Sequence, residues 1–298
     1  MPQTIHLSVS IPESMRGRRL DQALAELVPD YSRSRLQQWI RAGQVALDGR
    51  VPKTREIVQG GEQVQIDAEV TVETASKAQA IALNVVYEDD DLLVINKPPG
   101  LVVHPAAGNP DGTLLNALLY HAPDLAALPR AGIVHRLDKE TSGLMMVARN
   151  LAAHTRLVAA LQARDIGREY LAVVNTVLTA GGTVDAPIGR HPVDRKRMAV
   201  VSGGKPAVTH YRVVERFRAH TLVLLRQETG RTHQIRDHMA HNHSPLKGEP
   251  VYRGRLPQPR RAGDTLRTEL QGIRRQALHA QRLALQHPGS GEPVSWEA

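Results

Sequence analysis

A single carboxylate, Asp138, stands in a polar segment between two apolar runs, and its surroundings suit chemistry. Residues 135–143 read His-Arg-Leu-Asp-Lys-Glu-Thr-Ser-Gly, and the apolar runs 131–134 and 144–148 flank them. Apolar runs of this length are typical of buried strands, so we expect a loop between them whose polar atoms face a cleft. A carboxylate held there can act as a nucleophile or as a general base.

Two further polar sites could contribute to the same chemistry. Tyr170 opens an apolar run, residues 170–174, that is typical of a buried strand. Arg236 closes the segment 228–236, which reads as a strand end, a glycine turn and the start of a helix. Taken one at a time, each has a structural explanation, because loop carboxylates often cap helices, strand tyrosines often pack and helix arginines often form ion pairs.

The composition points to a polyanionic partner. The chain has 298 residues, a formal net charge of +8 and an isoelectric point near 10.0, which favours nucleic acid as the partner. It has no cysteine, so disulfides, thiolate metal sites and cysteine nucleophiles are excluded. No apolar run approaches the roughly 18 residues needed to cross a bilayer. The amino terminus lacks the charged and apolar regions of a secretory signal, so we expect a cytoplasmic protein without a membrane partner.

The basic charge is concentrated near the amino terminus. Residues 16–55 contain nine Lys or Arg against four Asp or Glu, a local excess of +5. Helical spacing predicts one helix over residues 20–28 and a second between Ser32 and Gly43. The Asp48-Gly49 pair predicts a hairpin joining residues 45–47 to Val51, and residues 64–66 complete a small sheet.

The rest of the chain predicts a larger, strand-rich domain. Residues 67–80 are polar and without periodicity, which is typical of a linker. From residue 81 onward, apolar runs typical of strands outnumber helical patterns and do not alternate with them regularly. We therefore expect an α+β fold with a mixed, largely antiparallel sheet over residues 81–298, after a small αα-β-hairpin domain over residues 1–66. Residues 253–276, with seven arginines, look like an exposed basic insertion.

Four motifs in order resemble those of the RluA family of pseudouridine synthases. The motifs are Asn96 to Pro105 (NKPPGLVVHP), His135 to Gly143 (HRLDKETSG), Arg168 to Ala172 (REYLA) and Gly230 to Arg236 (GRTHQIR). The resemblance runs over residues 81–298. The small amino-terminal domain resembles, in turn, an RNA-binding module found in a small-subunit ribosomal protein, as in two-domain members of the family.

The resemblance implies a role for each of the residues singled out above. Asp138 is the expected catalytic nucleophile, Tyr170 is expected over the target base to help with proton transfer, and Arg236 is expected to pair with Asp138 and keep it ionised. Arg136 is expected to fill the gap left by an extruded base. Further RNA contacts are expected from the basic side chains Arg33, Arg35, Arg41, Lys53, Arg55 and Arg231.

The implied reaction is the isomerisation of specific uridines to pseudouridine in large-subunit (23S) ribosomal RNA. It is neither a redox nor a group-loss reaction, so no cofactor and no metal are expected, nor an obligate protein partner. Asp138 could attack the sugar or promote an elimination as a base. Two alternatives stay open: a synthase acting on other ribosomal or transfer RNA sites, and a non-catalytic RNA-binding assembly factor on the same scaffold.

Two local features complete the predictions. The histidines at 233, 238, 241 and 243 lack the spacing and the accompanying carboxylate of a zinc site, so no metal site is predicted there. Asp237, beside Arg236, is an unexpected acid at the start of a helix, and we expect it to face solvent.

Overall fold

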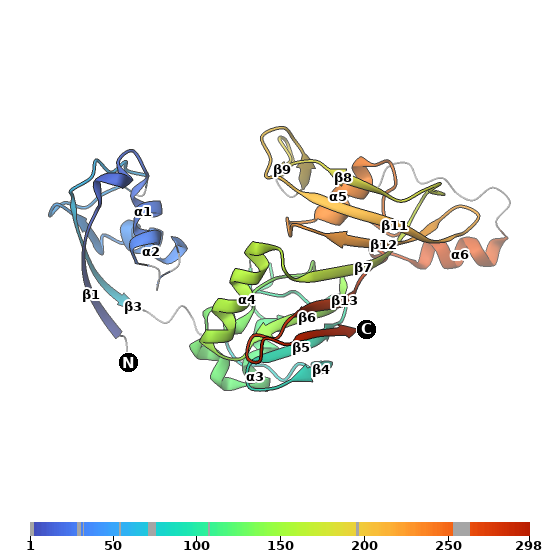
Figure 1. Ribbon diagram of the computed structural model, residues 1–298, viewed down its shortest axis with the longest axis horizontal. Coiled ribbons are helices and arrows are strands. Elements are labelled where there is room, and N and C mark those ends of the chain that lie inside the picture. Colours follow the sequence, from blue (N-terminus) through green and yellow to red (C-terminus); the bar gives the residue numbers. More distant parts are fainter. Residues whose placement is uncertain are drawn as a thin grey trace. The chain divides into compact units, whose positions relative to one another are not determined.

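The computed structural model (Figure 1) describes residues 3–28, 31, 33–53, 55–70, 76–106, 108–194, 197–252 and 263–298. The chain divides into two compact units, Met1–Ala75 and Ser76–Ala298. Each unit has its own hydrophobic core, so each is described by itself.

The amino-terminal unit packs two helices against a small antiparallel sheet. The sheet has the order β1 (Gln3–Ser10), β3 (Gln63–Val70), β2 (Val45–Leu47). A short 3-10 helix η1 (Glu13–Met15) precedes α1 (Leu20–Leu27) and α2 (Arg33–Arg41). Leu20, Leu24, Leu36, Trp39 and Ile40 are buried in its core. Both helices predicted from apolar spacing are confirmed.

The turn of the hairpin predicted after residue 47 is present, but the predicted second strand at Val51 is not. Asp48 and Gly49 both have positive φ, 49° and 77°, and Leu47 and Arg50 exchange backbone hydrogen bonds across them. Val51 then leaves the sheet and is exposed, because Pro52 has no N–H to continue a ladder. The true partner of β2 is β3.

The linker predicted to begin at residue 67 begins later. β3 runs to Val70 because β1, a strand not predicted from the sequence, pairs with it along its full length, from Gln3 opposite Val70 to Ser10 opposite Gln63. The alternation of Ile5, Leu7 and Val9 was the available signal for β1. The rest of that linker through residue 75 lies outside the described residues.

The second unit is built on a nine-stranded sheet. In spatial order it contains β4 (Val85–Glu88), β5 (Leu92–Lys97), β6 (Ser142–Ala148), β13 (Leu278–Gln286), β7 (Gly167–Val174), β12 (Thr221–Gln227), β11 (Val208–Arg216) and β8 (Gly182–Asp185), with β14 (Pro293–Glu297) paired to β13. β13 and β6 run parallel, and the other pairs of this sheet are antiparallel. The predicted α+β class with a largely antiparallel sheet is confirmed.

Helices and short elements surround this sheet. They are α3 (Leu114–His121), η2 (Pro123–Ala127), η3 (Pro129–Gly132), α4 (Leu151–Ala163), α5 (Gln234–His241) and α6 (Asp264–Gly272), with a separate β9–β10 pair (Ile188–Arg190 and Met198–Val200). α6 occupies part of the predicted basic insertion, whose residues 253–262 lie outside the described ranges.

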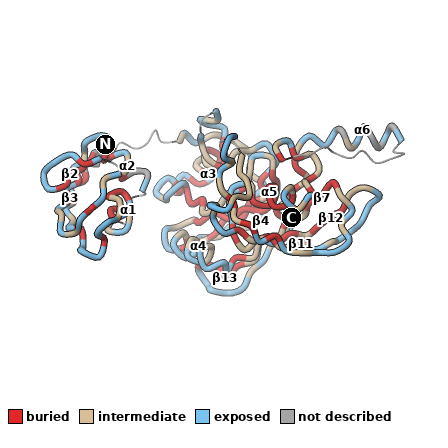
Figure 2. The backbone as a smooth tube through the Cα atoms, turned by 90° about the horizontal axis from the view of Figure 1, so that it is seen from above, coloured by how far each residue is buried: buried red, intermediate tan, exposed pale blue. Residues whose placement is uncertain are grey.

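The central strands are buried on both faces. Met145 and Val147 of β6 belong to one core cluster, whereas Leu144 and Met146 belong to a second cluster on the other face, against α4. Figure 2 shows this burial as red segments in the interior of the unit. Burial on both faces explains why the run 144–148 is apolar throughout rather than alternating.

The other run beside Asp138, residues 131–134, is not a strand, so that prediction is wrong. Arg130, Ala131 and Gly132 have left-handed φ values of 53°, 52° and 77°, which end any extended backbone there. A Cβ on Gly132 would lie 2.0 Å from the Ala148 carbonyl oxygen. The backbone here is therefore so close to β6 that only glycine fits. Only Ile133 then bridges to β6, at Val147.

Candidate active site

Asp138 lies in the turn that connects η3 to β6. Its carbonyl oxygen accepts a hydrogen bond from the Thr141 backbone N–H at 3.1 Å. The preceding residue, Leu137, is buried in the main core. This anchors the loop while leaving the Asp138 side chain 18% exposed, so the carboxylate reaches the cleft without losing all contact with water.

Lys97, at the end of β5, holds this loop from within the protein. The side chain is fully buried, and its Nζ donates to the carbonyl oxygens of Pro98, Leu101 and Lys139 at 2.8, 3.0 and 3.0 Å. Burial lowers the pKa of Lys97 to about 8. The lysine therefore ties the backbone beside Asp138 to the first of the four motifs, Asn96 to Pro105, a role that was not predicted from the sequence.

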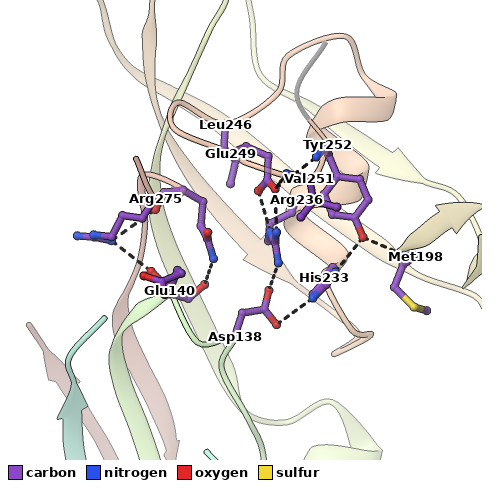
Figure 3. A network of polar contacts seen from close by, with 12 residues as sticks. Asp138, Glu140, Met198, His233, Arg236, Leu246, Glu249, Val251, Tyr252 and Arg275 are labelled. Atoms are coloured by element: carbon purple, nitrogen blue, oxygen red, sulfur yellow. Dashed lines mark hydrogen bonds and ion pairs between the residues drawn. The ribbon is translucent and has the colours of Figure 1, made fainter. Parts of the chain in front are cut away.

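Arg236 joins Asp138 to a second carboxylate, Glu249 (Figure 3). Nη1 of Arg236 donates to Oδ2 of Asp138 at 2.9 Å, while Nε and Nη2 donate to the two Glu249 oxygens, both at 2.7 Å. Arg236 is 6% exposed and Glu249 is fully buried as side chains. The bidentate contact fixes the plane of the guanidinium, so its third nitrogen is aimed at Asp138.

Electrostatics favour the charged forms of Arg236 and Glu249. Burial opposes the charge on Arg236, but hydrogen bonds to Glu249 and the negative charges of Asp138 and Glu249 raise the Arg236 pKa above its ordinary value. Burial likewise opposes ionisation of Glu249. Its hydrogen bonds from Arg236 and the positive charge of Arg236, together with backbone N–H groups of Val251 and Tyr252, still lower the Glu249 pKa below its ordinary value.

Glu249 was not among the residues predicted for the site. It follows Gly248, which has φ 73° and whose Cβ would lie 2.0 Å from the Arg275 carbonyl oxygen. That close approach turns the chain so that the next residue enters the protein interior. A carboxylate directly after a glycine and before Pro250 was the only local signal.

Tyr170 lies on β7 and lines the same cleft as Asp138. The side chain is 5% exposed, and burial raises its pKa; the Arg168 charge opposes this rise and the Asp138 charge adds to it. The phenol is therefore held in its neutral form. The structure brings together the three predicted catalytic residues, Asp138, Tyr170 and Arg236, from a loop, a strand and a helix.

The cleft has a volume of about 820 Å³ and a basic wall. The arginines that line it are Arg130, Arg136, Arg164, Arg168, Arg231 and Arg236, and the lining histidines are His104, His135 and His233. Burial, together with the charges of Arg130 and Arg136, lowers the pKa of His104 to about 4. Arginine suits recognition of phosphate, so this wall is electrostatically matched to a nucleic-acid backbone.

Two predicted RNA-contacting residues, Arg136 and Arg231, belong to this cleft. Arg136 is exposed and two residues from Asp138, and the described part of the chain offers it no ion-pair partner. Arg231 donates its Nε–H to the Pro206 carbonyl oxygen at 3.1 Å. This hydrogen bond does not use the two terminal nitrogens of the guanidinium.

The remaining predicted RNA-contacting residues lie on the amino-terminal unit. Arg41, Lys53 and Arg55 are exposed. Arg33 instead pairs with the buried carboxylate of Asp21 at 2.7 Å, so it has a structural role within the unit. The side chain of Arg35 lies outside the described residues.

The expectation that Asp237 faces solvent is wrong. Asp237 is 7% exposed, because α5 packs against β10 and β11. Its Oδ2 accepts no hydrogen bond from any described residue. Burial raises the Asp237 pKa, although His241, Arg197 and His191 oppose the rise.

The described residues form neither a metal centre nor a membrane span. Within the described ranges, no group of three or more His, Asp or Glu side chains is arranged to hold a metal ion. No described helix is both long and apolar enough to cross a membrane.

Comparison with known families matches both units. Residues 91–241 match the family described as RNA pseudouridylate synthase, and residues 18–64 match the S4 domain. The first match contains Asp138, Tyr170 and Arg236, and the second contains the amino-terminal helices.

Similar curated proteins and a similar solved structure carry pseudouridine synthase names as well. The chain is 60% identical over 284 residues to the ribosomal large subunit pseudouridine synthase D of Xanthomonas campestris, covering 95% of this chain and 86% of the relative. It is 56% identical to the proteins of the same name from Pseudomonas aeruginosa and Escherichia coli K12, covering all of this chain and 93% and 92% of theirs. The human RNA pseudouridylate synthase domain containing 1 structure is similar with a TM-score of 0.56 at 27% identity, over 74% of this chain and 84% of that one.

Proposed function

The chain belongs to the RNA pseudouridylate synthase family, and from this premise we propose that it converts specific uridines of large-subunit (23S) ribosomal RNA to pseudouridine. Its relatives named ribosomal large subunit pseudouridine synthase D, at 56–60% identity over nearly the whole chain, support this substrate. Ribosomal RNA is then the partner, with no obligate protein partner, and the expected location is the cytoplasm.

The reaction moves the uracil from one attachment to another on the same ribose. The bond between N1 and C1′ breaks, the uracil turns, and a bond between C5 and C1′ forms. The proton on C5 is lost and N1 gains one, so the product is an isomer of the substrate. The target uridine must first leave its stack, which costs roughly a few kcal/mol, and the basic cleft wall supplies binding free energy for that step.

Asp138 is the proposed nucleophile. Oδ2 is held by Arg236 at 2.9 Å, whereas Oδ1 accepts no hydrogen bond of ordinary length within the described structure. This leaves Oδ1 free to attack C1′, as a carboxylate does in retaining glycosidases, or to act as a base that starts an elimination. The Arg236 guanidinium places a positive charge beside the carboxylate that either route uses.

Tyr170 and Arg136 complete the proposed machinery. The neutral, buried phenol of Tyr170 beside Asp138 suits contact with the face of the base and proton transfer at C5. Arg136, exposed at the cleft and close to Asp138 in the chain, suits the space that the extruded base leaves in the RNA.

The Asp138–Arg236–Glu249 array in an arginine-lined cleft is the observation that carries this proposal. The test is to map pseudouridines in all ribosomal and transfer RNA of cells that lack the protein. We expect specific sites in large-subunit ribosomal RNA to be lost and then restored by the wild-type gene. Loss confined to small-subunit or transfer RNA would support a synthase with other targets, and an unchanged map would contradict the proposal.

A further inference from the structure

His233 has an unusual backbone conformation and lines the cleft, but it has no role in the mechanism proposed above. It precedes α5 with φ 57° and ψ 20°, a left-handed conformation that few residues other than glycine adopt. Such backbone strain tends to persist where a side chain must be aimed at a functional site. The side chain lines the cleft that holds Asp138.

The proton on the His233 imidazole is placed by Tyr252. The Tyr252 hydroxyl oxygen accepts the Met198 backbone N–H at 3.0 Å and lies 2.9 Å from Nδ1 of His233. If Nδ1 carried the proton, the hydroxyl would accept two hydrogen bonds and its own proton would have no acceptor among the described residues, so the Tyr252 O–H donates to Nδ1. The proton of a neutral imidazole must then be on Nε2.

The environment keeps His233 neutral. Burial lowers its pKa, and the charges of Arg236 and Arg136 act in the same direction, while Asp138 and Glu249 oppose them. The Tyr252 ring is 7% exposed and meets the imidazole edge to face, with centroids 5.8 Å apart. The same ring also packs against the Arg236 guanidinium, whose central carbon lies 5.4 Å from the ring centroid.

The protonated nitrogen is aimed at the reacting oxygen without bonding to it. Nε2 of His233 lies 3.9 Å from Oδ1 of Asp138, too far for a hydrogen bond. Figure 3 draws this contact as a dashed line between the two side chains. Oδ1 is also the Asp138 oxygen that Arg236 does not hold. The N–H donor and the free nucleophile oxygen therefore border the same small space.

We propose that His233 donates its Nε2 proton in a hydrogen bond to the 2′-hydroxyl of the target nucleotide. This inference rests on the proposed function. When Oδ1 faces C1′, the neighbouring 2′-oxygen lies beside the carboxylate, where the His233 donor points. In glycosidases, hydrogen bonds to the equivalent hydroxyl strengthen in the transition state. The contact would make His233 a specificity-determining residue for ribose over deoxyribose.

The ribose fits this donor better than the uracil does. His233 is fixed by its backbone strain and by Tyr252, so its N–H cannot follow a group that moves. The uracil detaches and turns during the reaction, whereas the 2′-hydroxyl stays beside C1′ from substrate to product. A fixed donor is therefore useful throughout only at the sugar.

A double-mutant cycle tests the contact. Wild type and His233→Asn would each be given full-length ribosomal RNA with uridine or 2′-deoxyuridine at the target, introduced by splinted ligation, and single-turnover rates measured. Asparagine tolerates a left-handed backbone but does not reach the Nε2 position. We expect the rate penalty for removing the 2′-hydroxyl to be about tenfold smaller in His233→Asn, matching the removal of one hydrogen bond.

Two further variants keep the test decisive if His233→Asn turns over too slowly. His233→Gln can place an amide N–H near the Nε2 position, so it should regain part of the 2′-hydroxyl preference. Tyr252→Phe removes the group that fixes the tautomer, so it should lose part of it. Each penalty is a ratio within one protein, so a reduced folded fraction cancels.

The outcomes separate the two proposals. Equal 2′-hydroxyl penalties in wild type and in the His233 variants would overturn the contact while leaving the proposed function intact. Failure of the wild-type enzyme to convert any uridine of ribosomal RNA would instead overturn the proposed function.

Discussion

At the scale of single residues, the site depends on one guanidinium shared by two carboxylates. Glu249 takes two nitrogens of Arg236 and leaves one for Asp138. A buried arginine with Asp138 alone would have a rotatable side chain and unsatisfied donors, which is costly. Glu249 therefore acts on Asp138 through Arg236, as a positioning residue.

Replacing Glu249 by glutamine should affect both catalysis and stability. The amide cannot accept both Arg236 donors, so Arg236 shifts from Asp138, and we expect kcat to fall by roughly 10²-fold. Removing one partner of a buried ion pair should lower the free energy of unfolding by about 3 kcal/mol. Single-turnover pseudouridine formation measures the first effect. Urea unfolding measures the second, followed by Trp296 fluorescence in a Trp39→Phe background, because the chain has only two tryptophans.

The stability effect of Glu249 has a defined pH dependence. A carboxyl whose folded pKa lies below its ordinary value of 4.5 stabilises the fold fully above that value, and the contribution is lost as the pH falls through the lower folded pKa. The wild-type advantage over Glu249→Gln should therefore be constant near neutral pH and shrink below about pH 4.5. Glu297→Gln, at an exposed ion pair with Arg282, is the control and should unfold like wild type. An advantage that grew on acidification would contradict the assignment.

Only some of these residues could be predicted from the sequence. Asp138, Tyr170 and Arg236 stand in motifs that can be recognised along the chain. Glu249 and Tyr252 acquire their roles only through contacts with side chains distant in sequence, and the His233 conformation depends on a positive φ that the spacing of residues does not reveal. The burial of Asp237 likewise follows from packing of α5 against β10 and β11.

At the scale of elements, the junction of β6 and β13 determines where the Asp138 loop leaves the sheet. Gly143 pairs with Ala280 where the two strands run parallel, and its φ is 114°. A Cβ there would lie 2.3 Å from the Ala280 carbonyl oxygen. Long, strongly apolar elements such as β6 were predictable from their composition, whereas this junction arises from strands that are far apart in the sequence.

Substituting Gly143 by alanine should disturb the loop and the sheet together. The clash is with backbone atoms, which cannot rotate away, and φ is unfavourable for an L-residue. We expect the free energy of unfolding to fall by roughly 2–4 kcal/mol and pseudouridine formation to fall with it. Gly203→Ala is the matched control, since a Cβ at Gly203 would meet nothing within 4 Å. Equal stability of the two variants by urea unfolding would show that the strands do not approach as closely as described.

At the scale of the whole molecule, the chain joins a catalytic unit to a separate unit with an S4 domain match. The local charge excess in residues 16–55 predicted a separate amino-terminal unit, because a basic cluster away from the catalytic motifs suggests a second RNA contact. The extent of the amino-terminal sheet was less predictable, since β1 and β3 pair across most of the unit's sequence.

Neutralising the exposed basic residues of the amino-terminal unit should weaken RNA binding without impairing chemistry. Arg41, Lys53 and Arg55 are all exposed, so their combined replacement by alanine should leave the fold intact. For every phosphate that is no longer neutralised, the slope of log K against log salt should decrease in magnitude by about 1. Binding titrations at several salt concentrations would measure the slope. The single-turnover rate at saturating enzyme should stay near that of the wild type. An unchanged slope would mean that these side chains do not bind RNA.

The most direct test of Asp138 as the catalytic carboxylate is pseudouridine formation by purified full-length Asp138→Asn. Asparagine keeps an oxygen that can accept from Arg236 but cannot act as an anionic nucleophile or base. We predict a loss of single-turnover rate of at least about a thousandfold, with affinity for large-subunit ribosomal RNA within a few-fold of wild type. A smaller loss of rate, measured at the same RNA occupancy, would contradict the assignment of Asp138 as the catalytic carboxylate.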